Sequence, residues 1–143
     1  MRKIRIADKL EEVDDYWNPR IVGELNDQHV KLVKFQGDFV WHHHADADEM
    51  FLVWRGSFRM DYRDAEGRER SMEVSEGEFV IVPRGTEHRP SAEEEVHVLL
   101  FEPAGTVSTG NVRNELTVEQ PIALQPQRQA NPRSATPVPH SPF

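Results

Sequence analysis

One stretch constrains this chain more than any other, the sequence WHHHADADE at residues 41–49. Side chains alternate between the two faces of an extended strand, so His42 and His44 point to one side and His43 to the other. Glu49 then opens a short apolar run that is followed by glycine, which favours a buried strand over a helix. Imidazole nitrogen and carboxylate oxygen suit a divalent transition metal, and a histidine from a later strand would complete a site of three histidines and one glutamate.

A second motif supplies that later histidine at residues 77–88. It begins with glycine and continues into the apolar run 79–82, which is expected to be a central strand covered on both faces. Pro83 and Gly85 then predict a sharp bend, because proline fixes one backbone dihedral and glycine permits a conformation closed to other residues. The bend directs His88 inward.

Together these stretches resemble the motifs of the cupin family, G(x)5HxH(x)3,4E(x)6G and G(x)5PxG(x)2H(x)3N. The matching residues are His42, His44, Glu49, Gly56, Gly77, Pro83, Gly85 and His88. Two positions depart from the pattern: Gly37 stands one residue too close to His42, and Ala92 replaces the closing asparagine. Neither is a ligand position. The motifs cover about residues 37–90, and the flanking strands extend the resemblance to about residues 20–110.

The resemblance implies an all-β fold, a double-stranded β-helix or jelly-roll barrel, preceded here by a short N-terminal helix. It also implies that four residues surround a divalent metal ion in the barrel, namely His42, His44, Glu49 and His88. Manganese, iron, nickel or cobalt would keep one or two positions open for water, substrate or dioxygen. Zinc also suits these ligands, although closure by all four would make a zinc site structural.

The reaction does not follow from the fold, because cupins include dioxygenases, isomerases, epimerases, decarboxylases and proteins that only bind. Our first hypothesis is a small metalloenzyme, of the oxygenase or isomerase type, acting on a small polar metabolite. The second is a non-enzymatic module that binds metal or a small ligand. An enzyme should carry a further acid or base beside the open metal position, and the candidates are Glu87, His97 and Tyr62.

Other polar residues in the predicted strands have less specific interpretations. His43 faces away from the ligands and is interpreted as a packing or surface residue rather than a ligand. His97 lies in an apolar strand and is interpreted as a buried residue near the site rather than a fifth ligand. The strand at 29–35 alternates lysine with apolar residues, which predicts one solvent-exposed face. An acidic hairpin tip is expected at 91–95.

The chain divides into three predicted regions. Residues 1–19 form an N-terminal segment packing on the barrel, with a helix from Ile6 to Trp17 that Pro19 ends. Residues 20–122 form the barrel. Residues 123–143 are rich in proline and glutamine and poor in apolar residues, which predicts a disordered tail.

The amino-acid composition limits the classes of partner that the protein is expected to bind. The 143 residues contain no cysteine, which excludes disulfides and thiolate metal sites. A formal net charge of −8 argues against binding nucleic acid or an anionic membrane surface. No apolar run is long enough for a membrane span or a signal sequence, so we expect a cytoplasmic protein whose partner is a small-molecule ligand.

The predicted strands also leave apolar side chains outside the barrel. Trp41 projects opposite the ligands, and Leu52 and Trp54 project opposite Glu49. A soluble monomer seldom leaves such a patch bare, which favours a two-fold homodimer. The alternative is that the N-terminal helix covers the same face within one chain. Its apolar residues are Leu10, Val13 and Trp17.

Overall fold

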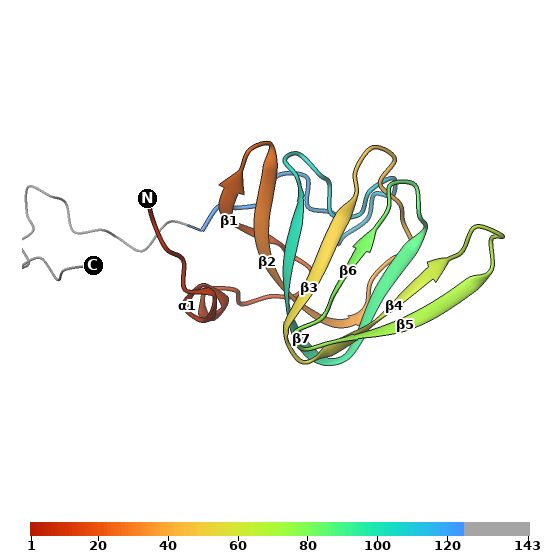
Figure 1. Cartoon of the computed structure of the whole chain (residues 1–143), viewed down its shortest axis with the longest axis horizontal. Coiled ribbons are helices and arrows are strands. Elements are labelled where there is room, and N and C mark those ends of the chain that lie inside the picture. Colours follow the sequence, from red (N-terminus) through yellow and green to blue (C-terminus); the bar gives the residue numbers. More distant parts are fainter. Residues whose placement is uncertain (125–143) are drawn as a thin grey trace, which may run out of the picture.

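The computed structural model describes residues 1–124 (Figure 1). The tail predicted at 123–143 lies outside this part apart from its first two residues, so its disorder stays a prediction. In chain order the described elements are α1 (Ile6–Glu11), β1 (Arg20–Leu25), β2 (Gln28–Asp38), β3 (Glu49–Arg55), β4 (Ser57–Arg63), β5 (Glu69–Ser75), β6 (Phe79–Val82) and β7 (His88–Pro103). Within residues 1–124, no helical segment has the length and apolarity needed to span a bilayer.

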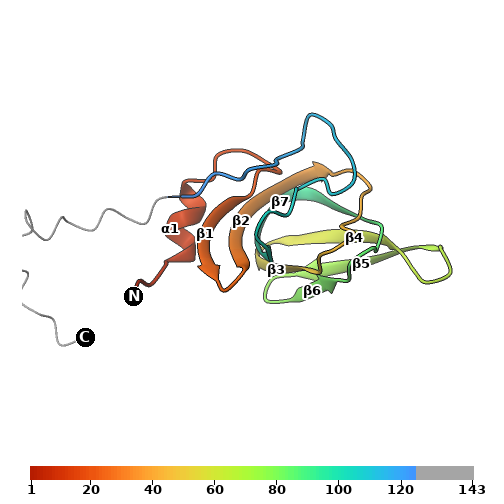
Figure 2. The ribbon, with the colours of Figure 1, turned by 90° about the horizontal axis from the view of Figure 1, so that it is seen from above.

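The strands form one antiparallel sheet that curls around a core. Its order is β1-β2-β7-β3-β6, and β4 pairs with both β5 and β7. Strand β7 connects the two parts because its first residues pair with β4 while its later residues pair with β2 and β3. Figure 2 shows from above that the sheet is bent around rather than flat. The predicted all-β barrel with a short N-terminal helix is confirmed.

Alternation along the strands fills the interior with apolar side chains. Phe51 and Val53 of β3 point inward and are buried, whereas Trp54 points outward and is exposed. Aromatic rings cluster at the centre, where the ring of Phe35 lies 5.6 Å from Phe58 and 6.3 Å from Phe51 between centroids. This cluster is one wall of the space in which the predicted site lies.

The N-terminal helix is shorter than predicted, ending at Glu11 instead of Trp17. Trp17 has φ = 60° and its backbone N–H donates to Lys34, and neither feature is compatible with a continuing helix. Its indole instead stacks on Phe35 and Phe39, with centroids 4.3 Å and 4.8 Å away, and its Nε1 donates to the Gln36 carbonyl. Trp17 therefore joins the barrel core.

Two strand predictions were wrong in detail. Residues 91–95 are not a hairpin tip but continue β7, because Ser91 and Ala92 are buried and pair with β2. Strand β6 is not covered on both faces, since it lies at the end of the sheet order and exposes Phe79 and Ile81. The apolar run at 79–82 thus indicated a strand correctly, but not its position in the sheet.

Candidate metal centre

The structure brings together the four residues that the two motifs predicted. His42, His44, Glu49 and His88 each offer one ligand atom, and these atoms all lie within 4.8 Å of one another. Their exposed fractions are 2%, 8%, 4% and 0%, respectively. Three titratable side chains from one short stretch and a fourth, His88, from a later part of the sequence are therefore concentrated in one buried place.

Backbone pairing brings the two motifs into contact. Residues 39–44 are not a regular strand as predicted, but His42 forms an isolated antiparallel bridge with His88 at the start of β7. Glu49 is the first residue of β3, whose neighbour β6 ends just before the Pro83 bend. The bend is held by the Gly85 N–H, which donates to the His44 carbonyl over 2.8 Å.

Carbonyl groups fix the orientation of two of the imidazoles. His42 Nδ1 lies 2.8 Å from the Val40 carbonyl, and His88 Nδ1 lies 2.8 Å from the Thr86 carbonyl. A carbonyl only accepts, so each Nδ1 carries the proton and each Nε2 presents a lone pair when the ring is neutral. This is the usual way in which proteins orient metal-binding histidines.

Several polar atoms of the cluster have no hydrogen-bond partner within the described part of the chain. They are His44 Nε2, Glu49 Oε1 and His88 Nε2. The two histidine nitrogens lie 3.4 Å and 3.5 Å from Glu49 Oε1. Leaving a buried polar atom unmatched costs about 1–3 kcal/mol, so three at one point indicate a missing partner. Three nitrogens and one oxygen form a donor set that fits manganese, iron, cobalt, nickel or zinc.

The pKa shifts of His42 and Glu49 favour the protonation states that bind a metal ion. Burial, followed by the proximity of His88, lowers the pKa of His42 from 6.5 to about 3. Burial opposes ionisation of Glu49, but its interactions with Glu102, His44 and His88 outweigh this effect and hold its pKa well below the usual range. Neutral imidazole and ionised carboxylate are the forms that coordinate metal.

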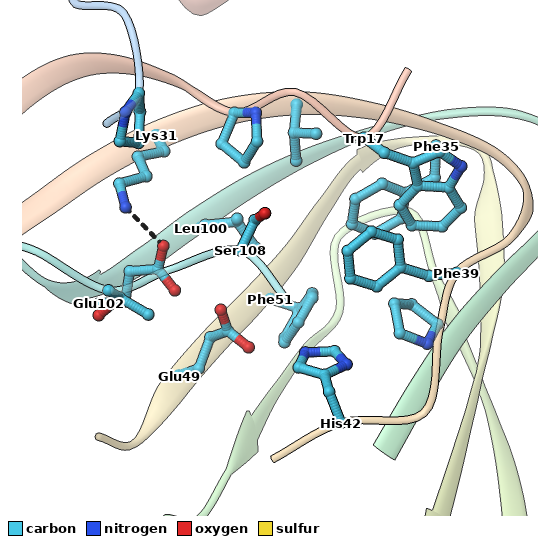
Figure 3. A pocket seen from close by; sticks show the side chains of 15 residues that line it. Trp17, Lys31, Phe35, Phe39, His42, Glu49, Phe51, Leu100, Glu102 and Ser108 are labelled. Carbon is cyan, nitrogen blue, oxygen red and sulfur yellow. Dashed lines mark hydrogen bonds and ion pairs between the residues drawn. The ribbon is translucent and has the colours of Figure 1, made fainter. Parts of the chain in front are cut away.

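A small cavity of about 30 Å³ adjoins the cluster. Figure 3 shows Glu49 and His42 on its border, aromatic side chains along one side and the Lys31–Glu102 pair on the other. The remaining lining residues are Pro19, Val33, Phe35, Phe51, Pro90, Leu100, Thr106, Ser108 and Pro121, with Trp17 and Phe39. The cluster therefore borders an internal space with an aromatic side and a charged side.

No sequence pattern indicated that Lys31 and Glu102 lie beside the site. Their exposed fractions are 1% and 2%, and Lys31 Nζ lies 2.7 Å from Glu102 Oε1. The prediction of a wet lysine face on residues 29–35 was wrong at Lys31, which shares the inward face with Val33 and Phe35. Burial, followed by the Glu49 carboxylate, raises the pKa of Glu102 well above its usual range, and Lys31 opposes this shift.

The acids and bases suggested by the sequence lie elsewhere. His43 Nδ1 pairs with Glu87 Oε1 at 2.8 Å, and His97 Nε2 pairs with Glu95 Oε2 at 2.8 Å. Among the described residues lining the cavity, neither these nor Tyr62 are present. The group beside the cluster is instead Glu102.

A loop after β7 packs against the first motif. The Asn111 side chain accepts from the His43 N–H over 2.9 Å, and the Asn111 N–H donates to the His43 carbonyl over 3.2 Å. Gly110 lies so close that a Cβ there would overlap the His43 carbonyl group. A surface hollow of about 350 Å³ lies between this loop and residues 43–47, and His44 is part of its lining.

Known proteins share this architecture. A model of the cupin domain matches residues 29–102. The protein YdbB of Bacillus subtilis is 37% identical over 68 residues, which span 48% of this chain and only 57% of that protein. A crystal structure of a cupin-2 domain protein from Shewanella frigidimarina is 40% identical, with a TM-score of 0.65, and the match covers 70% of this chain and 93% of the other.

A more distant likeness concerns the fold alone. Hydroquinone 1,2-dioxygenase from Sphingomonas sp. TTNP3, solved in complex with 4-nitrophenol, is 19% identical with a TM-score of 0.62. The match covers 70% of this chain and 32% of that one. The cupin match, however, spans over half of the chain, and the Shewanella relative is covered almost from end to end. The chain belongs to the cupin family.

Proposed function

We propose that this protein binds one divalent metal ion through His42, His44, Glu49 and His88 and acts as a small metalloenzyme on a small polar metabolite. The observation that carries the proposal is the convergence of buried donor atoms that lack partners, three of which belong to this cluster. A bound divalent ion would supply Lewis acidity toward a substrate oxygen or a site for dioxygen. The proposal includes chemistry of the oxygenase and of the isomerase type.

The residues of the chain perform the rest of the function. The carbonyls of Val40 and Thr86 hold the imidazoles of His42 and His88 with Nε2 toward the cluster. Aromatic side chains, including Phe39 and Phe51, line the neighbouring cavity and give it an apolar side. Polar interactions made beside buried apolar side chains are stronger than the same interactions in bulk water.

The charged groups beside the cluster favour catalysis over simple binding of a metal or a small ligand. An enzyme should carry an acid or base next to the metal, and Glu102 with Lys31 occupies that place. The small volume of the cavity supports the second candidate, a module that binds metal or a very small ligand without transforming it. Measuring turnover on a panel of substrates distinguishes the metalloenzyme from the binding module.

The test begins with metal analysis of protein purified without a histidine tag. The analysis should find a transition metal at about one equivalent per chain, as expected for a single four-ligand site. Dioxygen uptake and isomerisation of small polar substrates are then measured with that metal restored. Turnover that disappears on chelation supports the enzyme, whereas stoichiometric metal without turnover of any substrate supports the binding module. Protein that neither holds nor takes up a metal would contradict both.

We also propose that two copies associate through the outer face of β3 and β6. Leu52 pairs with Phe79 and Met50 pairs with Ile81, so these side chains share one face. Phe79 and Ile81 are 59% and 54% exposed, and Trp54 on the same face of β3 is 40% exposed. The helix α1 packs against β2 and leaves this face uncovered. A two-fold dimer is the commonest way to cover such a patch.

A further inference from the structure

The charged side of the cavity contains an atom that the proposed metal site does not use. Glu102 Oε1 pairs with Lys31 Nζ at 2.7 Å, but Glu102 Oε2 is buried and has no hydrogen-bond partner within residues 1–124. Glu102 is 2% exposed and lines the cavity opposite the aromatic side chains Trp17 and Phe39 (Figure 3). No described group thus donates a hydrogen bond to this buried carboxyl oxygen beside the cavity, although the Glu102 carboxyl also interacts with Glu49.

The packing of the barrel interior does not require the Lys31–Glu102 ion pair. Burying a lysine and a glutamate removes both charges from water, and replacing such a pair by apolar residues of similar size is often neutral or stabilising. The neighbouring lining residues Val33 and Leu100 show that apolar side chains fit at this depth. An ion pair with one free oxygen, placed next to a candidate metal centre, therefore points to recognition of a ligand.

The charges around the cavity restrict which ligand group can meet Glu102 Oε2. An ammonium group would be repelled by Lys31, whose Nζ lies 2.7 Å from the other oxygen, and by the divalent ion of the proposed site. A carboxylate would be repelled by Glu49 and by Glu102 itself. A neutral hydroxyl both donates and accepts hydrogen bonds, so it satisfies Oε2 whether or not the carboxyl carries a proton.

The volume of the cavity limits the size of that group. About 30 Å³ holds roughly two water-sized groups, since one water needs about 10–15 Å³ on this measure. A hydroxymethyl group, with its one carbon and one oxygen, matches this space. An aromatic ring is too large for it.

We propose that Glu102, held in place by Lys31, is the specificity-determining residue of the cavity and hydrogen-bonds a hydroxyl group on the short carbon skeleton of a small substrate. This inference rests on the proposed function, because it takes the cavity beside the metal cluster as the substrate site. It adds the substrate class, small hydroxylated compounds, and the residue that selects it.

Hydroxyacetone and acetone test the inference, because they share a carbonyl and differ by one hydroxyl. Each is titrated into metal-free and Mn²⁺-loaded protein, and the dissociation constants are measured by calorimetry. Wild type should bind hydroxyacetone about tenfold more tightly than acetone, the ratio expected for one additional hydrogen bond to a buried carboxyl group. The double variant Lys31→Met with Glu102→Leu should bind both equally.

Two further variants make the result specific. Arg5→Met with Asp8→Leu removes an exposed ion pair from α1 and should keep the wild-type ratio. Glu102→Gln keeps the size of the side chain but replaces one carboxyl oxygen by an amide NH₂ group that cannot accept, and should reduce the ratio to about threefold. This variant also tests the inference if the double variant does not fold.

The outcomes for the cavity and for the metal are separate. Equal binding of hydroxyacetone and acetone by wild type, or an unchanged ratio in Glu102→Gln, overturns the inference. Failure to bind Mn²⁺ or another transition metal overturns the proposed metal site instead, while the ratio in the metal-free protein still tests Glu102. A tenfold preference that depends on Glu102 supports the inference in either case.

Discussion

His42 and His88 exchange two backbone hydrogen bonds, from His42 N–H to the His88 carbonyl over 3.0 Å and from His88 N–H to the His42 carbonyl over 2.9 Å. Their imidazole rings lie 4.2 Å apart between centroids. The backbone therefore sets the distance between two candidate ligands before any metal binds. A site organised in this way loses less conformational entropy on binding than one assembled from mobile loops.

The first prediction concerns metal binding. His44→Ala combined with His88→Ala removes two of the four candidate ligands and should abolish binding of a divalent ion in calorimetry. His97→Ala is the matched control, because His97 pairs with Glu95 away from the cluster. Wild-type affinity in the double variant would show that the metal binds elsewhere, and lost affinity in the control would point to a general effect of removing histidine.

The second prediction concerns the stability of the metal-free protein. The pKa of His42 is about 3 in the folded state and 6.5 ordinarily, so below pH 6.5 the unfolded chain takes up a proton that the folded protein excludes. The contribution of His42 is therefore complete above pH 6.5 and is lost as the pH falls toward 3, by up to about 1.4 kcal/mol per pH unit.

Urea unfolding at about pH 7 and about pH 5 checks this prediction, with an expected loss of about 2 kcal/mol from His42 in wild type. His42→Gln cannot take up the proton and should show a correspondingly smaller loss between the same two conditions. Other titrating groups remain in both proteins, so the difference between the two losses isolates His42. Equal losses in both would mean that His42 does not resist protonation in the fold.

The candidate site was predictable where local spacing determines it. His42 and His44 share a side because of the two-residue period of an extended chain, and the bend at Pro83 and Gly85 follows from their backbone preferences. Their meeting with His88 does not follow from local rules. It was expected because both motifs resemble those of a known family.

The Lys31–Glu102 pair could not be predicted in the same way. These residues are 71 positions apart, and they meet only because β2 and β7 pair in a register that places Lys31 opposite Leu100. A lysine that alternates with apolar residues normally indicates a solvent-exposed face, but Lys31, Leu32 and Val33 are all buried, so both faces of β2 are covered at this point. The useful signal would have been Glu102, an acid directly following the apolar run of β7.

The third prediction concerns the loop that packs on the first motif. Gly110 has φ = 55°, and a Cβ there would overlap the His43 carbonyl oxygen and lie 3.2 Å from His42 Cδ2. Gly110→Ala therefore forces the loop away from the chain between two candidate ligands. Gly67→Ala is the matched control, since Gly67 also has a positive φ, of 78°, but a Cβ at that position would meet no atom within 4 Å.

The left-handed backbone alone costs alanine about 1–3 kcal/mol, and both variants carry this cost. Gly110→Ala should lose more free energy of unfolding than Gly67→Ala and should also bind metal more weakly. Urea denaturation and metal titration of the two variants give both quantities. Equal destabilisation with unchanged metal affinity would show that the loop shifts without affecting His42 or His43.

The last prediction concerns assembly. Trp54 is 40% exposed on the face of β3 that also presents Leu52, beside the exposed Phe79 of β6. Trp54→Glu places a charge in this apolar patch, and burying an unpaired charge in an interface costs several kcal/mol. Light scattering at micromolar concentration should therefore find a dimer for wild type and a folded monomer for the variant.

Leu25→Glu, at an exposed position of β1, is the control and should stay dimeric. A wild type that is already monomeric at this concentration rules the interface out, and dimers of all three proteins would place the contact on another face.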